Sequence, residues 1–508
     1  MRRFDRGEAV SANPVSSIDP ARLGEQARHA LTHGEEQVVL PAITQAAHAV
    51  RSDASLWQWK GLLHLGLSEH EDALAAFEIA SRLAPRDAKV AHARARTSLE
   101  AGLPAVDLFR QAYALAPSNG DVLLGLAAAR CAAGERDAAI AELDALLVAN
   151  PGWIPGHEAV CRLRWEDGER DGFARSLEEA LARAPRDSSL WHSYVILLTH
   201  AAKWQATLEA IRRARSLLGD LPFLAANEAI ALSESGDIAA ADARYADLAG
   251  REDMPLAAHR LRHELRAGRP DRAAKLGETW MRHPEARLIW PYMGLAWRLL
   301  DDPRWHWLDG DPRLVSVIDL EISAAELQGL GSLLRSLHNA KSHGLDQSVR
   351  GGTQTDGPLL NRLEPEFRQL RGLIKAAVLS HVSQLPAPDE GHPTLAPRRD
   401  RDIRFAGSWS VRLSSQGHHA NHIHPAGWIS SAFYVALPGA SERGAPPAGW
   451  LSLGKPQTEL GLDLPPNRMV EPKPGRLVLF PSTMWHGTVP FDAGERLTVA
   501  FDVAHPLV

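Results

Sequence analysis

Three histidines in the C-terminal part of the chain have the types and spacing of metal ligands. His422 and His424 lie two residues apart between apolar segments that alternate like strands, and His486 directly follows another apolar run, 477–480. Residues two apart on a strand point to the same side, so the first two imidazoles could be aimed at one point. Two close ligands and one distant ligand on a β scaffold are typical of a mononuclear metal site with open positions.

Other polar residues lie close to this trio in the sequence. His418 and His419 precede the pair, and we expect them to lie in a loop near the mouth of the site, because the strand period and the distant partner select His422 and His424. The glycine-rich polar segment 348–355 is expected to be a loop, either a lid over the substrate or an ordinary surface loop.

Composition sets the class of protein. The chain has 508 residues, which is too many for one core, and it is 45% hydrophobic and 23% charged, as soluble globular proteins are. A net charge of −6 gives no support for a nucleic-acid or anionic-membrane partner. The first residues lack the apolar region of a secretory signal, and no run approaches the roughly 18 apolar residues of a membrane span. With only two cysteines, Cys131 and Cys161, expected as buried free thiols, we predict a cytoplasmic protein.

Alanine-rich helical segments repeat with a period near 34 residues. Pro85, Pro117, Pro151 and Pro185 are spaced by 32, 34 and 34 residues, with Pro222 following at 37, and glycines recur between them. Glycine in one turn and proline after the second helix resemble tetratricopeptide repeats. The resemblance implies an all-α solenoid at 21–303, degenerate after about residue 250, behind a flexible leader at 1–20. Its concave face would bind a protein or peptide, although a solenoid that dimerises or braces the second domain is the alternative.

The pattern changes near Trp305. Ser323 with Glu326 three residues on predicts a capped helix over 323–340, and a second helix is expected at about 363–383. Alternating or apolar runs bounded by glycine and proline predict strands at 402–415, 429–438, 449–454, 467–471, 475–481 and 495–504. Several short strands of this kind favour a jelly roll or a related double sheet.

Several motifs in chain order resemble one enzyme superfamily. They are the segments 347–355, 421–425 (Asn-His-Ile-His-Pro), 430–435, 474–487 and 495–501. Residues 304–508 are similar to iron(II)/2-oxoglutarate-dependent oxygenases, and within them to a bacterial 2OG-Fe(II) oxygenase group often found behind tetratricopeptide repeats. The resemblance implies a double-stranded β-helix (jelly-roll) domain with flanking helices.

The resemblance also assigns the ligands of the metal. The superfamily's iron site is His-x-Asp/Glu with a distant His, which places ligands at His422 and His486 and the carboxylate position at His424. This is a departure from the superfamily, because three imidazoles carry no charge. If His424 is not a ligand, Asp492 or Asp502 could supply the carboxylate.

A second set of residues is implied for the cosubstrate. Arg496, ten residues after His486, matches the arginine that holds the far carboxylate of 2-oxoglutarate, and a guanidinium fork suits that group. Thr498 faces the same way and could add a hydroxyl, while Tyr434 and Trp409 could line the 2-oxoglutarate pocket or simply pack in the core.

The function implied is an Fe(II)- and 2-oxoglutarate-dependent dioxygenase, with dioxygen as cosubstrate and ascorbate as a candidate accessory reductant. We expect it to hydroxylate a side chain of a protein or peptide recruited by the repeats. Three alternatives stay open: a small-molecule hydroxylase whose solenoid serves assembly, a non-catalytic scaffold with a degenerate oxygenase domain, and a cupin-like metal protein without 2-oxoglutarate. The last has no use for Arg496.

Overall fold

The computed structural model describes residues 19–251 and 253–506. Almost all of the predicted leader, 1–20, therefore lies outside the described residues. The chain divides into two compact units, one up to Pro117 and one from Ser118 to Pro506. Helices fill the first unit, and the second unit contains further helices followed by all of the β-structure.

Within the described residues of the first unit, 19–117, six helices follow one another, and each packs against the next. They are α1 (Pro20–His33), α2 (Glu36–Ala49), α3 (Ala54–Gly66), α4 (His70–Leu83), α5 (Ala88–Glu100) and α6 (Val106–Leu115). Asp19, Asp53 and Asp87 recur every 34 residues, and each caps the first helix of a pair by accepting hydrogen bonds from backbone N–H groups. The repeat period is therefore also the period of the helix caps.

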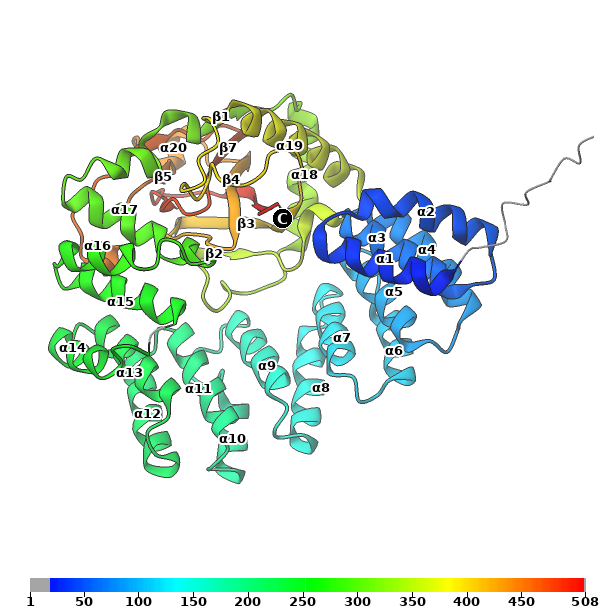
Figure 1. Ribbon diagram of the computed structural model, residues 1–508, viewed down its shortest axis with the longest axis horizontal. Coiled ribbons are helices and arrows are strands. Elements are labelled where there is room, and N and C mark those ends of the chain that lie inside the picture. Colours follow the sequence, from blue (N-terminus) through cyan, green and yellow to red (C-terminus); the bar gives the residue numbers. More distant parts are fainter. Residues whose placement is uncertain (1–18, 252, 507–508) are drawn as a thin grey trace, which may run out of the picture. The chain divides into compact units, whose positions relative to one another are not determined.

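The helical repeats continue through the first half of the second unit, where Figure 1 shows them following one another in chain order. They are α7 (Gly120–Ala132), α8 (Arg136–Ala149), α9 (Ile154–Glu166), α10 (Arg175–Arg183), α11 (Ser188–His200), α12 (Trp204–Leu218), α13 (Pro222–Glu234), α14 (Ile238–Asp247), α15 (Met254–Arg266), α16 (Pro270–Glu278) and α17 (Trp290–Leu299). The predicted helical solenoid is confirmed in this coarse form. One detail was wrong: Pro222 begins α13 instead of following a helix end.

The turns inside the repeats need a left-handed residue. Gly134, Gly168 and Gly236 have φ of 80°, 93° and 88°, a region that costs glycine no steric strain. In the slot where the sequence has alanine, Ala202 takes the same region with φ of 53°. The turn that contains Ala202 is held by the contact of His200 with Asp346.

Two general features of the described chain bear on its class. None of the helices in residues 19–251 and 253–506 is long and apolar enough to cross a bilayer. Cys131 and Cys161 are buried free thiols, as expected, and burial raises their pKa values to about 11 and about 12.

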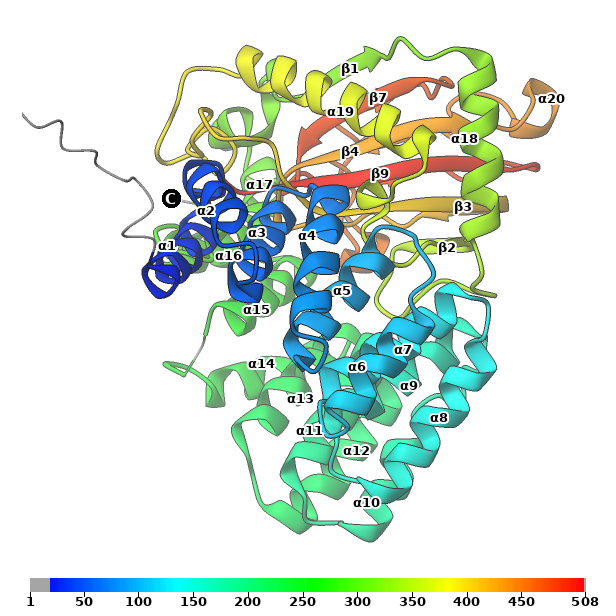
Figure 2. The ribbon, with the colours of Figure 1, turned by 90° about the vertical axis from the view of Figure 1, so that its right-hand side faces the viewer.

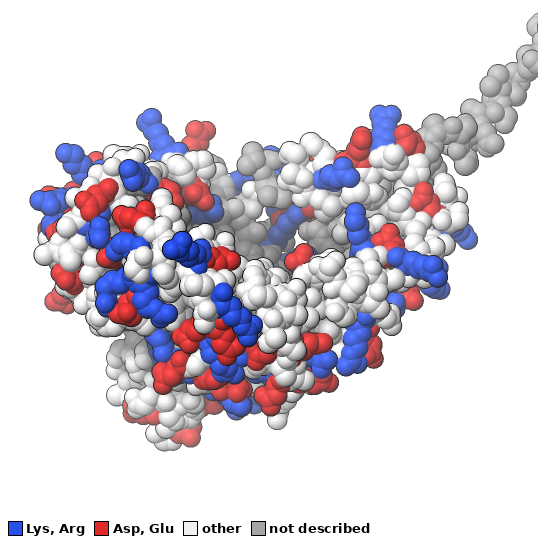
Figure 3. All heavy atoms as spheres, turned by 90° about the horizontal axis from the view of Figure 1, so that it is seen from below, with Lys and Arg blue, Asp and Glu red and all other residues white. Residues whose placement is uncertain are grey.

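In Figure 3 the Lys and Arg side chains lie among Asp and Glu side chains over the visible face, so neither sign of charge dominates that face.

The C-terminal part is rich in sheet. Its helices are α18 (Ala324–Leu337), α19 (Pro365–Gln384) and the short α20 (Ala440–Arg443), and its strands are β1 (Ser316–Asp319), β2 (Val349–Gln354), β3 (Phe405–His419), β4 (Gly427–Ala436), β5 (Leu451–Leu453), β6 (Arg468–Val470), β7 (Arg476–Pro481), β8 (His486–Thr488) and β9 (Arg496–Ala504). A six-stranded sheet has the order β1-β7-β4-β9-β3-β2, and a three-stranded sheet has the order β6-β5-β8. All the pairs are antiparallel.

Most of the predicted elements are confirmed. Both helices are present, and the capping box of Ser323 and Glu326 begins α18. All six predicted strands occur within a few residues of their expected ends. The segment 348–355 is a correction: it forms β2, an edge strand paired with β3, and so is not the loop or lid that was expected.

The large sheet has an apolar core on one face and a mixed interior on the other, where Val478 and Phe480 pack with the small sheet beside buried polar residues. Leu497, Val499 and Phe501 of β9 pack with α18 and α19 in one apolar cluster, and Figure 2 shows these helices lying along the sheet. The alternate residues of β9 point the opposite way, because side chains alternate along a strand. That second face carries Arg496, Thr498 and Asp502, the charged and polar residues of interest.

A buried histidine on α19 provides a test of the packing. His381 is 1% exposed, and burial lowers its pKa to about 4. It stays neutral in the folded protein while the unfolded chain takes up a proton below about pH 6.5, so unfolding becomes easier as the pH falls from 6.5 towards 4. Between pH 7 and 5 this residue alone should remove about 2 kcal/mol of unfolding free energy, at about 1.36 kcal/mol per pH unit.

The measurement is urea unfolding of the wild type and of His381→Gln at both pH values. We expect the variant to lose about 2 kcal/mol less stability than the wild type over this interval. The hydrogen bond from Ser316 to His381 is lost at both pH values and cancels in the comparison. Equal losses in the two proteins would show that His381 is not held neutral.

Candidate metal centre

Backbone hydrogen bonds hold the segment that carries His422 and His424. This segment connects β3 to β4, and an isolated antiparallel bridge joins His422 to His486. The His422 N–H donates to the His486 carbonyl at 2.8 Å, and the His486 N–H donates back at 3.0 Å. The His424 N–H donates to the Ser482 carbonyl at 2.9 Å. The sequence pattern predicted a regular strand here. The segment is instead an extended connection, hydrogen-bonded to β8 and to the turn before it.

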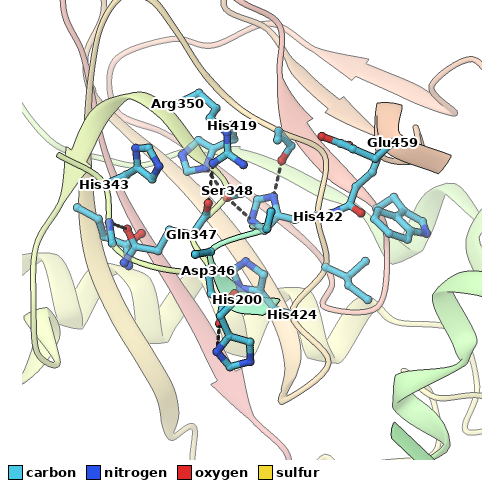
Figure 4. Close-up of a pocket in the computed structure, with 18 of the residues that line it drawn as sticks. His200, His343, Asp346, Gln347, Ser348, Arg350, His419, His422, His424 and Glu459 are labelled. Atoms are coloured by element: carbon cyan, nitrogen blue, oxygen red, sulfur yellow. Dashed lines mark hydrogen bonds and ion pairs between the residues drawn. The ribbon is translucent and has the colours of Figure 1, made fainter. Parts of the chain in front are cut away.

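These contacts bring the three side chains together. Ring centroids of His422 and His486 are 4.2 Å apart, those of His422 and His424 are 4.8 Å apart, and those of His424 and His486 are 5.0 Å apart. One ring nitrogen from each lies within 4.8 Å of the others, the arrangement in which a single metal ion could be held. Figure 4 shows His422 and His424 side by side at one end of a cavity.

Hydrogen bonds select which nitrogen each ring offers. The Nδ1 atoms of His422 and His486 lie 2.9 Å from the Ala420 carbonyl and 3.0 Å from the Met484 carbonyl. Nδ1 of His424 lies 2.7 Å from Oδ2 of Asp502. Carbonyl and carboxylate oxygens only accept, so each Nδ1 carries the proton and each Nε2 carries a lone pair. This is how a histidine ligand is usually oriented by its surroundings. The lone pair of His422 Nε2 faces the Ser348 hydroxyl at 3.2 Å.

Two of the rings, those of His422 and His486, are also in the protonation state that a metal requires. Burial, and next the proximity of His424, lowers the pKa of His422 to about 3. Burial, and next the proximity of His422, holds the pKa of His486 well below its usual value. A neutral imidazole at physiological pH is the form that binds metal ions.

Asp502 contacts Nδ1 of His424 and is not one of the groups that converge on the candidate metal position. Its Oδ2 accepts from His424, and its Oδ1 accepts from the Ser430 hydroxyl at 2.5 Å. Asp492 is not part of the cluster either, since the group of potential ligands in the described residues contains only the three histidines at this place. The geometry therefore favours His424 over either aspartate as the third ligand, with the carboxylate charge supplied through it.

Asp502 gives a direct test of this arrangement. Replacing it with asparagine keeps its shape but removes the charge and lets an amide N–H face Nδ1 of His424. We expect the affinity for Fe(II) or Co(II) to fall about 10- to 100-fold, as is typical when the hydrogen-bond partner of a ligand is lost. Metal titration by calorimetry measures this, and the exposed Asp492→Asn is the matched control. An unchanged affinity in Asp502→Asn would contradict the role given to Asp502.

Arg496 lies on the same face of β9 as Asp502, and in the described chain its buried side chain has a donor atom without an acceptor. Its side chain is 2% exposed and its guanidinium lies 5.1 Å from the ring of Tyr434, which is fully buried. Within residues 19–251 and 253–506, Nε of Arg496 and the hydroxyl of Tyr434 have no hydrogen-bond partner. Burial lowers the pKa of Arg496, and the neighbouring Tyr434 partly opposes this shift. A buried cation with open donors fits a carboxylate ligand such as the one that was expected here.

The other residues predicted to contact the cosubstrate, Thr498, Trp409 and Tyr434, do not lie together. The Thr498 hydroxyl is buried and lies 3.4 Å from the Val411 carbonyl of β3. Trp409 has its ring centroid 5.4 Å from that of His424 and lines the cavity beside the histidines. Trp409 is thus close to the candidate metal centre, whereas Tyr434 packs against Arg496 in the interior of the domain.

Three nearby residues differ from or extend the prediction. His418 and His419 belong to the end of β3 instead of a loop, a correction caused by their pairing with β2. Ser348 was not singled out, yet its hydroxyl lies 3.2 Å from Nε2 of His422 and 3.0 Å from Nδ1 of His419. Only the register of β2 against β3 places Ser348 there, and the sequence carried no signal for that strand.

Comparisons with known proteins agree with both parts of the chain. Residues 407–502 match the family described as "Putative 2OG-Fe(II) oxygenase", and residues 105–160 match the tetratricopeptide repeat. The two resemblances noted in the sequence are therefore confirmed: the chain combines a tetratricopeptide-repeat region with a domain of this oxygenase family. A search of curated proteins gave no match.

Similar solved structures are tetratricopeptide-repeat and related proteins. One from Parabacteroides merdae is 14% identical, with 55% of this chain and 98% of that chain covered and a TM-score of 0.31. A thermophilic tetratricopeptide-repeat protein from Thermus thermophilus is 21% identical, with 34% and 93% covered and a TM-score of 0.25. The MamA protein is 17% identical, with 34% and 92% covered and a TM-score of 0.29.

Proposed function

We propose that residues 304–508 form an Fe(II)/2-oxoglutarate-dependent dioxygenase and that residues 21–303 recruit its substrate. The substrate would be a side chain of a protein or peptide, bound on the concave face of the repeats. We further propose that the two sheets are the walls of a double-stranded β-helix. The observation that carries the proposal is the convergence of three imidazoles whose Nδ1 atoms all have other hydrogen-bond partners.

The residues of the site have separate roles in this proposal. His422, His424 and His486 would hold the iron, and Arg496 would bind the far carboxylate of 2-oxoglutarate with its guanidinium fork. Asp502 fixes the proton of His424 on Nδ1 and supplies the negative charge that the histidine set lacks. When bound, iron(II) and 2-oxoglutarate supply the chemistry by which one oxygen of O2 enters a substrate C–H bond and the other enters succinate, with release of CO2.

The walls of the site support this use. Trp409 and Trp485 line the cavity beside the histidines and limit the access of water to the reacting position. Arg496 and Tyr434 are buried and do not line the cavity, so the far carboxylate of 2-oxoglutarate would be held away from the space that a substrate would enter. Free buried cysteines are consistent with a reducing compartment, and we propose that the protein is cytoplasmic.

The test is anaerobic reconstitution with Fe(II), followed by measurement of succinate formed from 2-oxoglutarate in air, with and without cell lysate. We expect slow succinate formation by the protein alone and faster formation when lysate supplies the substrate. Peptides from the lysate should gain the mass of about one oxygen, which identifies the modified residue. Failure of the purified protein to bind iron would refute the enzyme, and would leave a scaffold as the function of the chain.

A further inference from the structure

The cavity beside the histidines has walls from two parts of the second unit. It has a volume of about 570 Å³, within the range of ligand-binding pockets. His422 and His424 lie in one wall, with residues 343–348 of the loop before β2. Repeat residues form the opposite wall: Trp165 at the end of α9, residues 200–202 at the turn after α11, and Tyr292 on α17.

Direct contacts fix the repeat wall to the sheet domain. The backbone N–H groups of Lys341 and Ser342 donate to the Glu166 carbonyl at 3.1 Å and 3.0 Å. Nδ1 of His200 lies 2.8 Å from Oδ2 of Asp346, the contact drawn in Figure 4. These bonds join the ends of α9 and α11 to the loop that lines the site. The repeat helices are therefore a structural part of the catalytic cavity.

Two buried donor atoms of the described residues at this wall lack acceptors, one on Trp165, which lines the cavity, and one on Arg170, which packs against Trp165. The guanidinium of Arg170, in the loop after α9, lies 3.9 Å from the ring centre of Trp165. In the described part of the chain, Nη1 of Arg170 and Nε1 of Trp165 are buried and have no hydrogen-bond partner. A buried polar group that makes no hydrogen bond is destabilising. Two such donors side by side indicate a place for an acceptor that is not part of this chain.

The surroundings of these two donor atoms are electropositive. Burial, followed by the charges of Arg170 and Arg350, lowers the pKa of His343 to about 4. Arg350 also lowers the pKa of Arg170, after the effect of burial. Arg350 lines the cavity beside His419, as Figure 4 shows, and its Nη1 donates to the carbonyls of residues 347 and 349. Two arginines and a histidine therefore lie within electrostatic range of one another.

The nearby carboxylates are paired with other groups. Glu169 and Asp171, on either side of Arg170 in sequence, form ion pairs with Arg175 and Lys203. In the cavity itself Asp346 is paired with His200, and Glu459 is the remaining acid of the lining.

Among the residues that the structure describes, neither Arg170 nor Arg350 has an ion-pair partner within 4.0 Å. Glu459, the one acid of the lining without such a pairing, makes no ion pair with either arginine. The charge that these two arginines would attract is therefore missing from the chain.

We propose that this cavity binds an acidic segment of a polypeptide, with a carboxylate held by Arg170, Arg350 and the indole N–H of Trp165. The guanidinium of Arg170, the N–H groups of Arg350 that residues 347 and 349 leave free, and one neutral donor suit the acceptor-only oxygens of an ionised Asp or Glu side chain. Because the binding wall consists of repeat-helix ends, a chain that leaves the cavity can continue along the repeats, which a free small acid cannot do. The side chain placed beside the three histidines would then lie close in sequence to an acidic residue. Oxidation of that side chain rests on the proposed function, but the binding does not.

The test is a binding measurement on metal-free protein, so that it does not depend on turnover. A fluorescently labelled peptide with three Glu and Asp residues is compared by anisotropy with the same peptide in which they are Gln and Asn. We expect the acidic peptide to bind at least about 10-fold more tightly, because charged hydrogen bonds contribute about 1.5–3 kcal/mol. The difference should disappear in the double variant Arg170→Gln/Arg350→Gln. Arg162→Gln, which removes an exposed charge from α9, is the matched control and should bind like the wild type.

Two outcomes would overturn the inference. Equal affinity for the acidic and amide peptides would show that the unpaired donors of Arg170 and Trp165 do not bind a carboxylate of the peptide. Full displacement of the peptide by free glutarate at the peptide's own concentration would assign the site to a small acid. Neither outcome affects the iron and succinate measurements, and loss of those activities would not affect the peptide measurement. Arg170→Lys with Arg350→Lys keeps both charges without the fork, and should retain part of the preference if the protein is folded.

Discussion

Replacing His486 with alanine is expected to remove iron binding and succinate formation together. His486 is the one candidate ligand on β8, so its loss leaves only the two imidazoles of the connecting segment, and a stable site needs at least three protein ligands. We expect the affinity for Fe(II) to fall by more than about 100-fold, beyond the effect of losing a hydrogen-bond partner of a ligand. Metal content after anaerobic reconstitution and succinate release measure the two effects.

The loss of iron binding in His486→Ala can be distinguished from a general loss of folding. Both hydrogen bonds between His422 and His486 use backbone atoms, so alanine keeps the bridge that positions the segment. The ring of His486 packs 4.7 Å from that of Phe480, and its removal leaves a cavity that should lower stability by a few kcal/mol at most. His418→Ala removes a histidine outside the trio and should bind iron normally. Iron binding by His486→Ala at the wild-type level would exclude the proposed site.

Local patterns were sufficient to find the candidate ligands and most of the elements around them. Alternating apolar residues in β9, and the capping box of Ser323 and Glu326, are signals that neighbouring residues carry by themselves. The period of 34 residues is likewise a property of the chain, because every repeat uses the same turn and the same packing. For this reason the helices, the six strands and the trio of histidines could be predicted.

What could not be predicted depends on contacts between distant parts of the chain. The hydrogen bond of His424 to Asp502 joins residues 78 apart, and only the pairing of β4 with β9 brings them together. The strand β8 has three residues and β2 contains two glycines, so neither has a recognisable strand pattern. The contact of His200 with Asp346 joins a repeat turn to the loop before β2, and no local pattern encodes it.

The carboxylate that the candidate metal centre lacks is the clearest case. From the sequence, His424 in place of an acid left open whether Asp492 or Asp502 is the real ligand. In the structure both oxygens of Asp502 accept hydrogen bonds, one of them from His424 itself. The acid and the histidine are therefore partners and not alternatives, because a carboxylate hydrogen-bonded to Nδ1 makes the imidazole a stronger donor to a metal.

Replacing Arg496 with glutamine is expected to raise the concentration of 2-oxoglutarate needed for succinate formation by about 30- to 4000-fold. Truncating one partner of a buried, hydrogen-bonded charge pair costs about 2–5 kcal/mol, which gives this range. Iron binding should persist, because Arg496 is not among the nitrogens that converge on the metal position. The initial rate of succinate release as a function of 2-oxoglutarate concentration measures the effect, and Fe(II) titration of the same sample measures the control quantity.

Two further variants make the result specific to the buried guanidinium. Arg496→Lys keeps the charge but offers no fork, so its 2-oxoglutarate requirement should fall between those of the wild type and Arg496→Gln. Arg412→Gln removes the exposed arginine that pairs with Glu495 on the neighbouring strand, and should leave the requirement unchanged. If Arg496→Gln kept the wild-type requirement, the open donors of Arg496 and Tyr434 would not be a carboxylate site. Iron binding by the wild type without succinate formation from 2-oxoglutarate would instead favour a metal protein that does not use 2-oxoglutarate.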